Sequence, residues 1–186
     1  VRRAWELGHA LLRRRIDTPR PLICIDHSLA HPHRSYLLTA AIPGAMTVTE
    51  FLEHDWPTQT AGTQQAWLQG HLRRLAAQIS QLHNCGFDHR DLKFSNLLVT
   101  ADPGDPRVWL LDLDGMREWR RLPLARRVQN LARIHLSAQA HQLGSLADRA
   151  RFLQQYLGPD RARFAAAGDL QCATLRELMP MLLKEA

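Results

Sequence analysis

The chain has 186 residues, 45% of them hydrophobic, and a formal net charge of +6. This length and composition fit one domain with a sizeable core, and no apolar run approaches the roughly 20 residues that a membrane-spanning helix requires. Three widely spaced cysteines without a CxxC pair favour a reduced, cytoplasmic setting, and the basic charge comes without a zinc-finger, helix-turn-helix or RNA-binding pattern, so we expect no nucleic acid partner.

The first half of the chain predicts a helix, two strands and a long second helix. Residues 2–15 place apolar side chains on one helical face and end in arginines, and Thr18–Pro21 interrupts this helix. Two strands, a turn, a short helix and a long amphipathic helix follow, at residues 22–25, 35–42, 43–44, 49–54 and 63–84. We expect Gly86 to end the long helix in a left-handed conformation.

The second half predicts a polar loop, a pair of strands and then helices. The loop covers residues 87–96, and the turn-rich segment 101–107 joins the two strands. The strands are expected at residues 97–99 and 108–113, and the helices at 124–140, 145–157 and 169–185. This mixture of helices and short strands predicts the α+β class.

The segment His89–Asn96 matches the kinase pattern H-R-D-L-x-x-x-N at every fixed position. Phosphoryl transfer needs a carboxylate that accepts the proton of the attacking hydroxyl, which predicts Asp91 as the catalytic carboxylate. Lys93 would contact the transferred phosphoryl group of the nucleotide, and Asn96 would bind Mg²⁺ through its side-chain oxygen. The structural alternatives are a turn cap for Asp91, a solvated lysine and a turn-forming asparagine.

A second metal carboxylate is expected from the segment Leu110–Gly115. Asp112 ends the apolar run and fits the metal ligand best, and Asp114 is a further candidate ligand or a turn residue before the glycine. Along an extended strand these two side chains would point to the same side. Because Mg²⁺ prefers few carboxylates, with waters and phosphates completing its octahedron, Asn96 and Asp112 suffice.

These residues resemble the bacterial lipopolysaccharide kinase family, the Kdo and heptose kinases of the inner core, within the protein-kinase-like superfamily. The resemblance also includes the segments Ile16–Pro21, Ala41–Ala45, Leu111–Arg117, Arg126–Ala132 and Arg151–Leu157. It implies a protein-kinase-like fold, mostly its helical C-lobe at residues 43–186, preceded by a remnant of the N-lobe at residues 1–42.

The resemblance implies ATP and Mg²⁺ as cofactors. The hinge backbone at Ala40 and Ile42 would meet adenine, and Glu6 would orient a nucleotide-binding lysine unless it is a solvated helix charge. No glycine-rich phosphate loop occurs, and no lysine precedes Lys93. We therefore expect that the first N-lobe strands are missing from this chain, with weak or no nucleotide binding by the chain alone; a naturally degenerate kinase is the alternative.

The resemblance implies phosphorylation of a sugar hydroxyl on the lipopolysaccharide inner core, a lipid-linked acceptor at the cytoplasmic face of the inner membrane. A basic segment would either attract this acidic acceptor, with peripheral membrane contact, or form a solvated face. Its residues are Arg117, Arg120, Arg121, Arg126 and Arg127. The alternatives are a kinase acting on a small-molecule or protein hydroxyl, and a non-catalytic pseudokinase or scaffold fragment.

Overall fold

The computed structural model describes residues 1–26 and 35–158, and its mixture of helices and small antiparallel sheets confirms the α+β class. The α-helices are α1 (Arg2–Arg13), α2 (Val48–Glu50), α3 (Ala61–Asn84), α4 (Leu124–Ala140) and α5 (Leu146–Leu157). The strands are β1 (Pro21–Ile25), β2 (Tyr36–Thr39), β3 (Ala45–Thr47), β4 (Phe87–His89), β5 (Leu97–Thr100), β6 (Val108–Leu110) and β7 (Met116–Glu118). Short 3₁₀ or π segments are η1 (Phe51–Asp55), η2 (Trp56–Thr58), η3 (Phe94–Asn96) and η4 (Leu113–Gly115).

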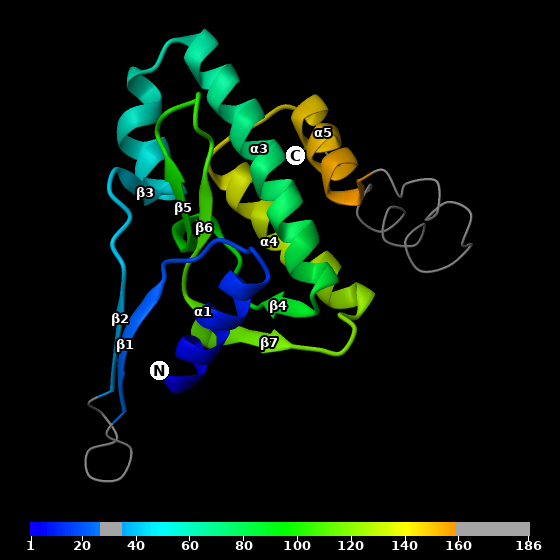
Figure 1. Cartoon of the computed structure of the whole chain (residues 1–186). Helices are drawn as coiled ribbons and strands as arrows, with labels where there is room; N and C mark the ends of the chain where they lie inside the picture. The colour runs from blue at the N-terminus through cyan, green and yellow to red at the C-terminus, as the bar shows by residue number, and fades with distance from the viewer. Residues whose placement is uncertain (27–34, 159–186) are drawn as a thin grey trace.

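Helix α3 is the longest element and contacts α5 on one side and β6 on the other (Figure 1). The Thr60 side chain caps its first turn by accepting a hydrogen bond from the Thr63 amide at 3.2 Å. The predicted apolar stripe is buried, since Leu68, Leu75 and Ile79 are at most 7% exposed. No helix among the described residues combines the length and apolarity needed to cross a bilayer.

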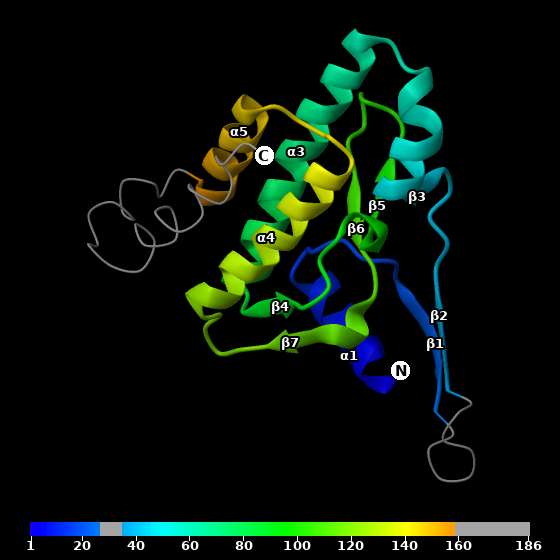
Figure 2. The ribbon, with the colours of Figure 1, turned by 180° about the vertical axis from the view of Figure 1, so that it is seen from behind.

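The strands form three separate antiparallel sheets. One sheet has the order β3-β5-β6, the second pairs β4 with β7, and the third pairs β1 with β2. Figure 2 shows the β1–β2 ribbon beside α1 and extending away from α3, α4 and α5. Its apolar side chains Leu22, Ile23 and Leu38 are each at least 46% exposed. Strands β5 and β6 are instead buried on the core side, with Leu97 opposite Leu110 in the register.

Several predicted boundaries were wrong, for local reasons. Helix α1 ends at Arg13 rather than at residue 15, because Arg15 adopts a left-handed φ of 57°. Helix α3 begins at Ala61, two residues before the predicted start, because the Thr60 side chain caps it there. The strand predicted over 108–113 ends at Leu110, because Asp112 is left-handed, with a φ of 53°. Strands β3, β4 and β7 were not predicted, and the predicted helix 169–185 lies outside the described residues.

Gly86 joins α3 to β4 in the predicted left-handed conformation, with a φ of +85°. The Gly86 carbonyl accepts a hydrogen bond from the Trp119 amide at 2.9 Å, directly after β7. A Cβ at position 86 would lie 2.1 Å from the Trp119 carbonyl oxygen. Glycine is therefore required twice, for its backbone conformation and for the close approach of the chain that follows β7.

We expect Gly86→Ala to lower the free energy of unfolding by about 2 kcal/mol or more, because alanine disfavours positive φ and its methyl group overlaps the Trp119 carbonyl. Urea denaturation of the full-length protein measures this change. Gly62→Ala is the matched control. Gly62 lies in the first turn of α3 with open space at its Cβ position, so alanine there should add up to about 1 kcal/mol. Equal effects of the two substitutions would contradict the account.

Candidate active site

In the segment from β4 through η3, residues 87–96, buried apolar side chains alternate with exposed polar ones. Leu92 is 0% and Phe94 5% exposed, whereas the side chains of Asp91 and Lys93 are 44% and 49% exposed. Two apolar side chains thus fix the loop in the core, and the polar side chains between them are presented to solvent. This segment is called the catalytic loop below.

Asp91, Lys93 and Asn96 lie together on this loop. The Lys93 Nζ is 2.8 Å from the Asp91 Oδ2, and the Asn96 Nδ2 donates to the same oxygen at 3.0 Å and to the Asp91 carbonyl at 2.8 Å. The hydrogen bond from Lys93 is the largest influence on the Asp91 carboxyl and lowers its pKa, and the bond from Asn96 lowers it further. Asp91 is therefore an ionised carboxylate at neutral pH, as a proton acceptor must be.

Backbone hydrogen bonds place Asp112 beside this loop. The Leu111 amide donates to the Asn96 carbonyl at 2.9 Å, and the Leu111 carbonyl accepts from the His89 Nε2 at 2.7 Å. Burial lowers the pKa of His89, while the charges of Asp112 and Asp91 act to raise it, so both carboxylates lie within electrostatic reach of this ring. Three predicted site residues, Asp91, Asn96 and Asp112, thus converge.

Asp112 holds an uncommon backbone conformation, with φ 53° and ψ 63°. The left-handed region costs a residue other than glycine roughly 1–2 kcal/mol, and Asp tolerates it better than most. The two hydrogen bonds on Leu111, immediately before it, hold the chain in place. Backbone strain that is maintained in this way is typical of functional sites.

Asp114 lies apart from this group. It belongs to the η4 turn, its side chain is 66% exposed, and its Oδ1 is 3.7 Å from the Val1 nitrogen, directly before α1. The prediction that Asp112 and Asp114 extend to the same side of one strand was wrong, because the strand ends at Leu110, Asp112 caps a 3₁₀ turn and Asp114 belongs to that turn.

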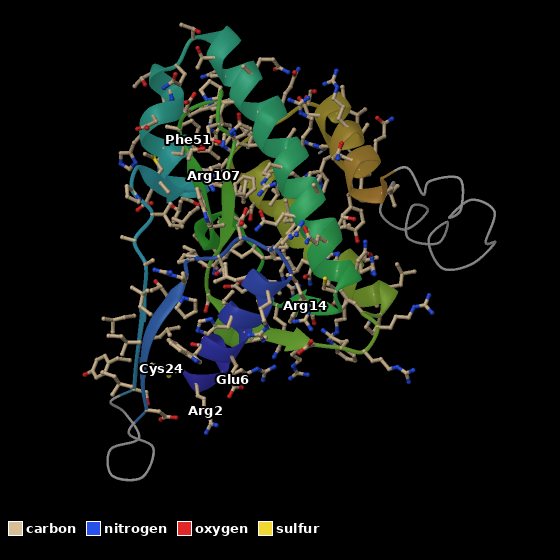
Figure 3. All side chains as sticks on the ribbon, viewed as in Figure 1. Arg2, Glu6, Arg14, Cys24, Phe51 and Arg107 are labelled. Atoms are coloured by element: carbon tan, nitrogen blue, oxygen red, sulfur yellow. The ribbon has the colours of Figure 1, made fainter. Side chains whose placement is uncertain are left out.

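The three residues predicted to contact the nucleotide from the N-terminal part of the chain form hydrogen bonds within the chain. Glu6 is 63% exposed and accepts a hydrogen bond from the Arg2 Nε at 3.2 Å, and Figure 3 shows the two side chains together near the start of α1. The Ala40 amide donates to the Arg20 carbonyl at 2.8 Å, and the Ile42 carbonyl accepts from the Ala45 amide at 3.2 Å. These two backbone groups are therefore already engaged within the chain.

The oxygens near the catalytic loop fit a magnesium ion. Because the Asn96 Nδ2 faces Asp91, the amide oxygen is the atom left for a cation. The Asp112 carboxylate is exposed and, among residues 1–26 and 35–158, accepts no hydrogen bond and forms no ion pair. The same ranges hold no cluster of three or more His, Cys, Asp or Glu that could bind a metal unaided. One amide and one carboxylate, completed by phosphates and water, suit Mg²⁺.

The basic segment divides into two parts. Arg127 donates to the Asn84 Oδ1 and to the His83 carbonyl, each at 3.1 Å, and the Arg126 Nε is 3.9 Å from the Asp88 Oδ2. These two arginines therefore connect α4 to the end of α3 and to β4. Arg117, Arg120 and Arg121 are exposed, so they are the members of the segment that are available to an external anion.

Sequence reasoning missed Asn130 as a site residue. It is fully buried on α4, and its Oδ1 accepts a hydrogen bond from the His89 amide at 3.0 Å. Its position was the available signal, because this amide stands next to Leu131 on the buried face of the helix, which also holds Ile134 and His135. A buried polar side chain in such a position requires a specific partner.

The sequence pattern of the Lipopolysaccharide kinase (Kdo/WaaP) family matches residues 1–156. Two curated relatives are both 3-deoxy-D-manno-octulosonic acid kinases. The one from Vibrio parahaemolyticus is 24% identical over 142 residues, which cover 74% of this chain and 54% of the relative. The one from Mannheimia succiniciproducens is 27% identical over 139 residues, which cover 72% and 51%. The chain thus spans about half the length of these curated relatives.

A solved structure of WaaP in complex with acyl carrier protein superposes with a TM-score of 0.69 at 19% sequence identity, and the match covers 97% of this chain and 76% of that one. This likeness shows a shared fold. The family match covers most of the chain, including the catalytic loop and the segment around Asp112. As its motifs predicted, the chain belongs to the Lipopolysaccharide kinase (Kdo/WaaP) family.

Proposed function

We propose that this chain carries the catalytic part of an ATP-dependent phosphotransferase that phosphorylates a sugar hydroxyl of the lipopolysaccharide inner core. The observation that carries the proposal is the convergence of an ionised Asp91, held by Lys93 and Asn96, with Asp112 on the neighbouring segment. Family membership supports the reaction class.

In this proposal Asp91 accepts the proton of the acceptor hydroxyl as that oxygen bonds to the γ-phosphorus of ATP, and the bond from this phosphorus to the ADP oxygen breaks so that ADP leaves. Its exposure and its lowered pKa suit that task, because the carboxylate is accessible and ionised. The Lys93 Nζ, at 2.8 Å from Asp91, lies where it can also stabilise the charge of the transferred phosphoryl group. Asp91 and Lys93 are therefore the proposed catalytic pair.

Asn96 and Asp112 are the proposed Mg²⁺ ligands, and Asp114 is an outer candidate because it lies within the η4 turn with its side chain 66% exposed. When bound with ATP, Mg²⁺ neutralises the charge that develops on the phosphates. Glu6, Ala40 and Ile42 remain proposed contacts on the nucleotide side. The hinge amide of Ala40 is engaged by Arg20, so any adenine contact there must use other backbone groups.

The proposed acceptor is a lipid-linked sugar acid, 3-deoxy-D-manno-octulosonic acid, because two curated relatives are kinases of that sugar. Such an acceptor is anionic, and Arg117, Arg120 and Arg121 are exposed shortly after the Asp112 segment. The same arginines would support peripheral contact with anionic lipid at the cytoplasmic face of the inner membrane.

We expect Asp91→Asn to lower kcat by about 10²–10⁴-fold, because the amide cannot accept the hydroxyl proton. The measurement is transfer of labelled phosphate from Mg²⁺·ATP to the lipid-linked sugar acid by the full-length protein. Asp102→Asn, at an exposed carboxylate in the β5–β6 connection, is the matched control and should leave kcat unchanged. An Asp91→Asn variant with half of the normal rate would refute the catalytic role.

Transfer of phosphate to a peptide or a small molecule in place of the lipid-linked sugar would refute the proposed acceptor.

Removing Lys93 should change the pH dependence of the reaction. Because Lys93 is the main cause of the lowered Asp91 pKa, Lys93→Met should raise this pKa toward its usual value. A depressed pKa keeps the carboxylate ionised as the pH falls, so the acid limb of kcat/KM should move to higher pH in the variant. A carbon-13 NMR titration of the Asp91 carboxyl gives the same shift without relying on activity. An unmoved carboxyl titration would contradict the assigned ion pair.

A further inference from the structure

Four polar side chains lie buried beneath the start of the catalytic loop. They are Asn130 on α4, His83 on α3, Asp88 on β4 and Tyr156 on α5, and we call them the Asn130 cluster. Each of them is at most 5% exposed. Burial of polar groups costs free energy unless hydrogen bonds compensate, and apolar side chains would fill this space without that cost. The cluster therefore calls for a functional explanation.

Asn130 both accepts and donates hydrogen bonds at the start of the catalytic loop. Its Oδ1 accepts from the His89 amide at 3.0 Å, and its Nδ2 donates to the Asp88 Oδ1 at 2.8 Å. A backbone amide can only donate and a carboxylate can only accept, so the orientation of the Asn130 side chain is fixed. An aspartate would lose the donor and a leucine would lose both groups. Asn130 thus holds the backbone two residues before Asp91.

The remaining members of the cluster hold Asn130 itself. Burial, together with the nearby Arg127, lowers the pKa of His83 to about 3, so its ring is neutral at physiological pH. The His83 Nε2 is 3.3 Å from the Asn130 Oδ1, which can only accept, so Nε2 donates. The His83 Nδ1 then accepts from the Tyr156 hydroxyl at 2.8 Å. The hydrogen bonds therefore connect α3, α4 and α5 to a single amide.

We propose that Asn130 is a positioning residue for phosphoryl transfer, which rests on the function proposed above. By fixing Asp88 and His89, it sets the direction in which the chain leaves β4 toward Asp91. It also positions the His89 ring, whose Nε2 donates a hydrogen bond to the Leu111 carbonyl next to Asp112. Because Asn130 is 0% exposed, it acts through the loop and not by contact with a substrate, so its loss should reduce kcat far more than it changes the KM for ATP.

The test exchanges the partners of one hydrogen bond. Asn130→Asp keeps the acceptor for the His89 amide but sets two carboxylates against each other, and kcat should fall at least tenfold with the KM for ATP changed less than threefold. Adding Asp88→Asn restores a donor opposite an acceptor, with the direction reversed, and should return kcat to within about threefold of wild type. Gln129→Glu is the matched control, because it makes the same amide-to-acid change on the exposed neighbour in α4 and should leave kcat unchanged.

Amide hydrogen exchange of the same full-length variants separates this inference from the proposed function, because it needs no activity. Exchange at His89 should accelerate at least tenfold in Asn130→Asp and return toward wild type in the double variant, even if no acceptor is ever phosphorylated. A wild-type kcat in folded Asn130→Asp would overturn the inference. Unchanged exchange at His89 in this variant would also overturn it. A third contrary result would be a double variant in which His89 is protected again but kcat stays low while the wild type is active.

Discussion

Two hydrogen bonds to the backbone of Leu111 unite the candidate active site. Its amide donates to the Asn96 carbonyl and its carbonyl accepts from His89, so the catalytic loop and the Asp112 segment are joined at one residue. Without these bonds, Asn96 and Asp112 would sit on two independently moving loops, and a shared cation would have to order both of them at a cost in conformational entropy. With the bonds in place, the oxygens are already arranged before a nucleotide arrives, which is the condition for electrostatic stabilisation of phosphoryl transfer.

The core explains why these bonds can hold a strained residue. Leu92 and Phe94 fix the catalytic loop from below, and the Thr18 hydroxyl bonds the Leu110 carbonyl at 2.7 Å just before Leu111. The backbone on both sides of Asp112 is therefore determined by buried contacts, since η4 also packs against α1. These surrounding contacts maintain the local strain at Asp112. Exposed arginines contribute little to this framework, because solvent screens their ion pairs.

The sequence predicted the features that depend on local patterns. The apolar stripe of α3, the left-handed Gly86 and the connection over residues 101–107 all follow from helical periodicity or turn residues, and the structure confirms them. Sequence patterns did not predict the features that depend on long-range contacts. Strands β4 and β7 are three residues each and form only because they pair with one another, which no local pattern indicates. The sequence placed Asp112 in an apolar strand, because its left-handed conformation depends on the hydrogen bonds that Leu111 forms with other segments. Asn130 lies in the segment Arg126–Ala132, which carries part of the family resemblance, but its partners lie on other elements, so no local pattern indicated its role.

The decisive measurement is the structure of the full-length protein with Mg²⁺ and a non-hydrolysable ATP analogue. We expect a cation at about 2.0–2.1 Å from the Asn96 Oδ1 and from one carboxylate oxygen of Asp112, with Asp91 outside the coordination shell and open to the acceptor side. A cation held by Asp114 without Asp112, or an Asn96 oxygen turned away from the phosphates, would contradict it.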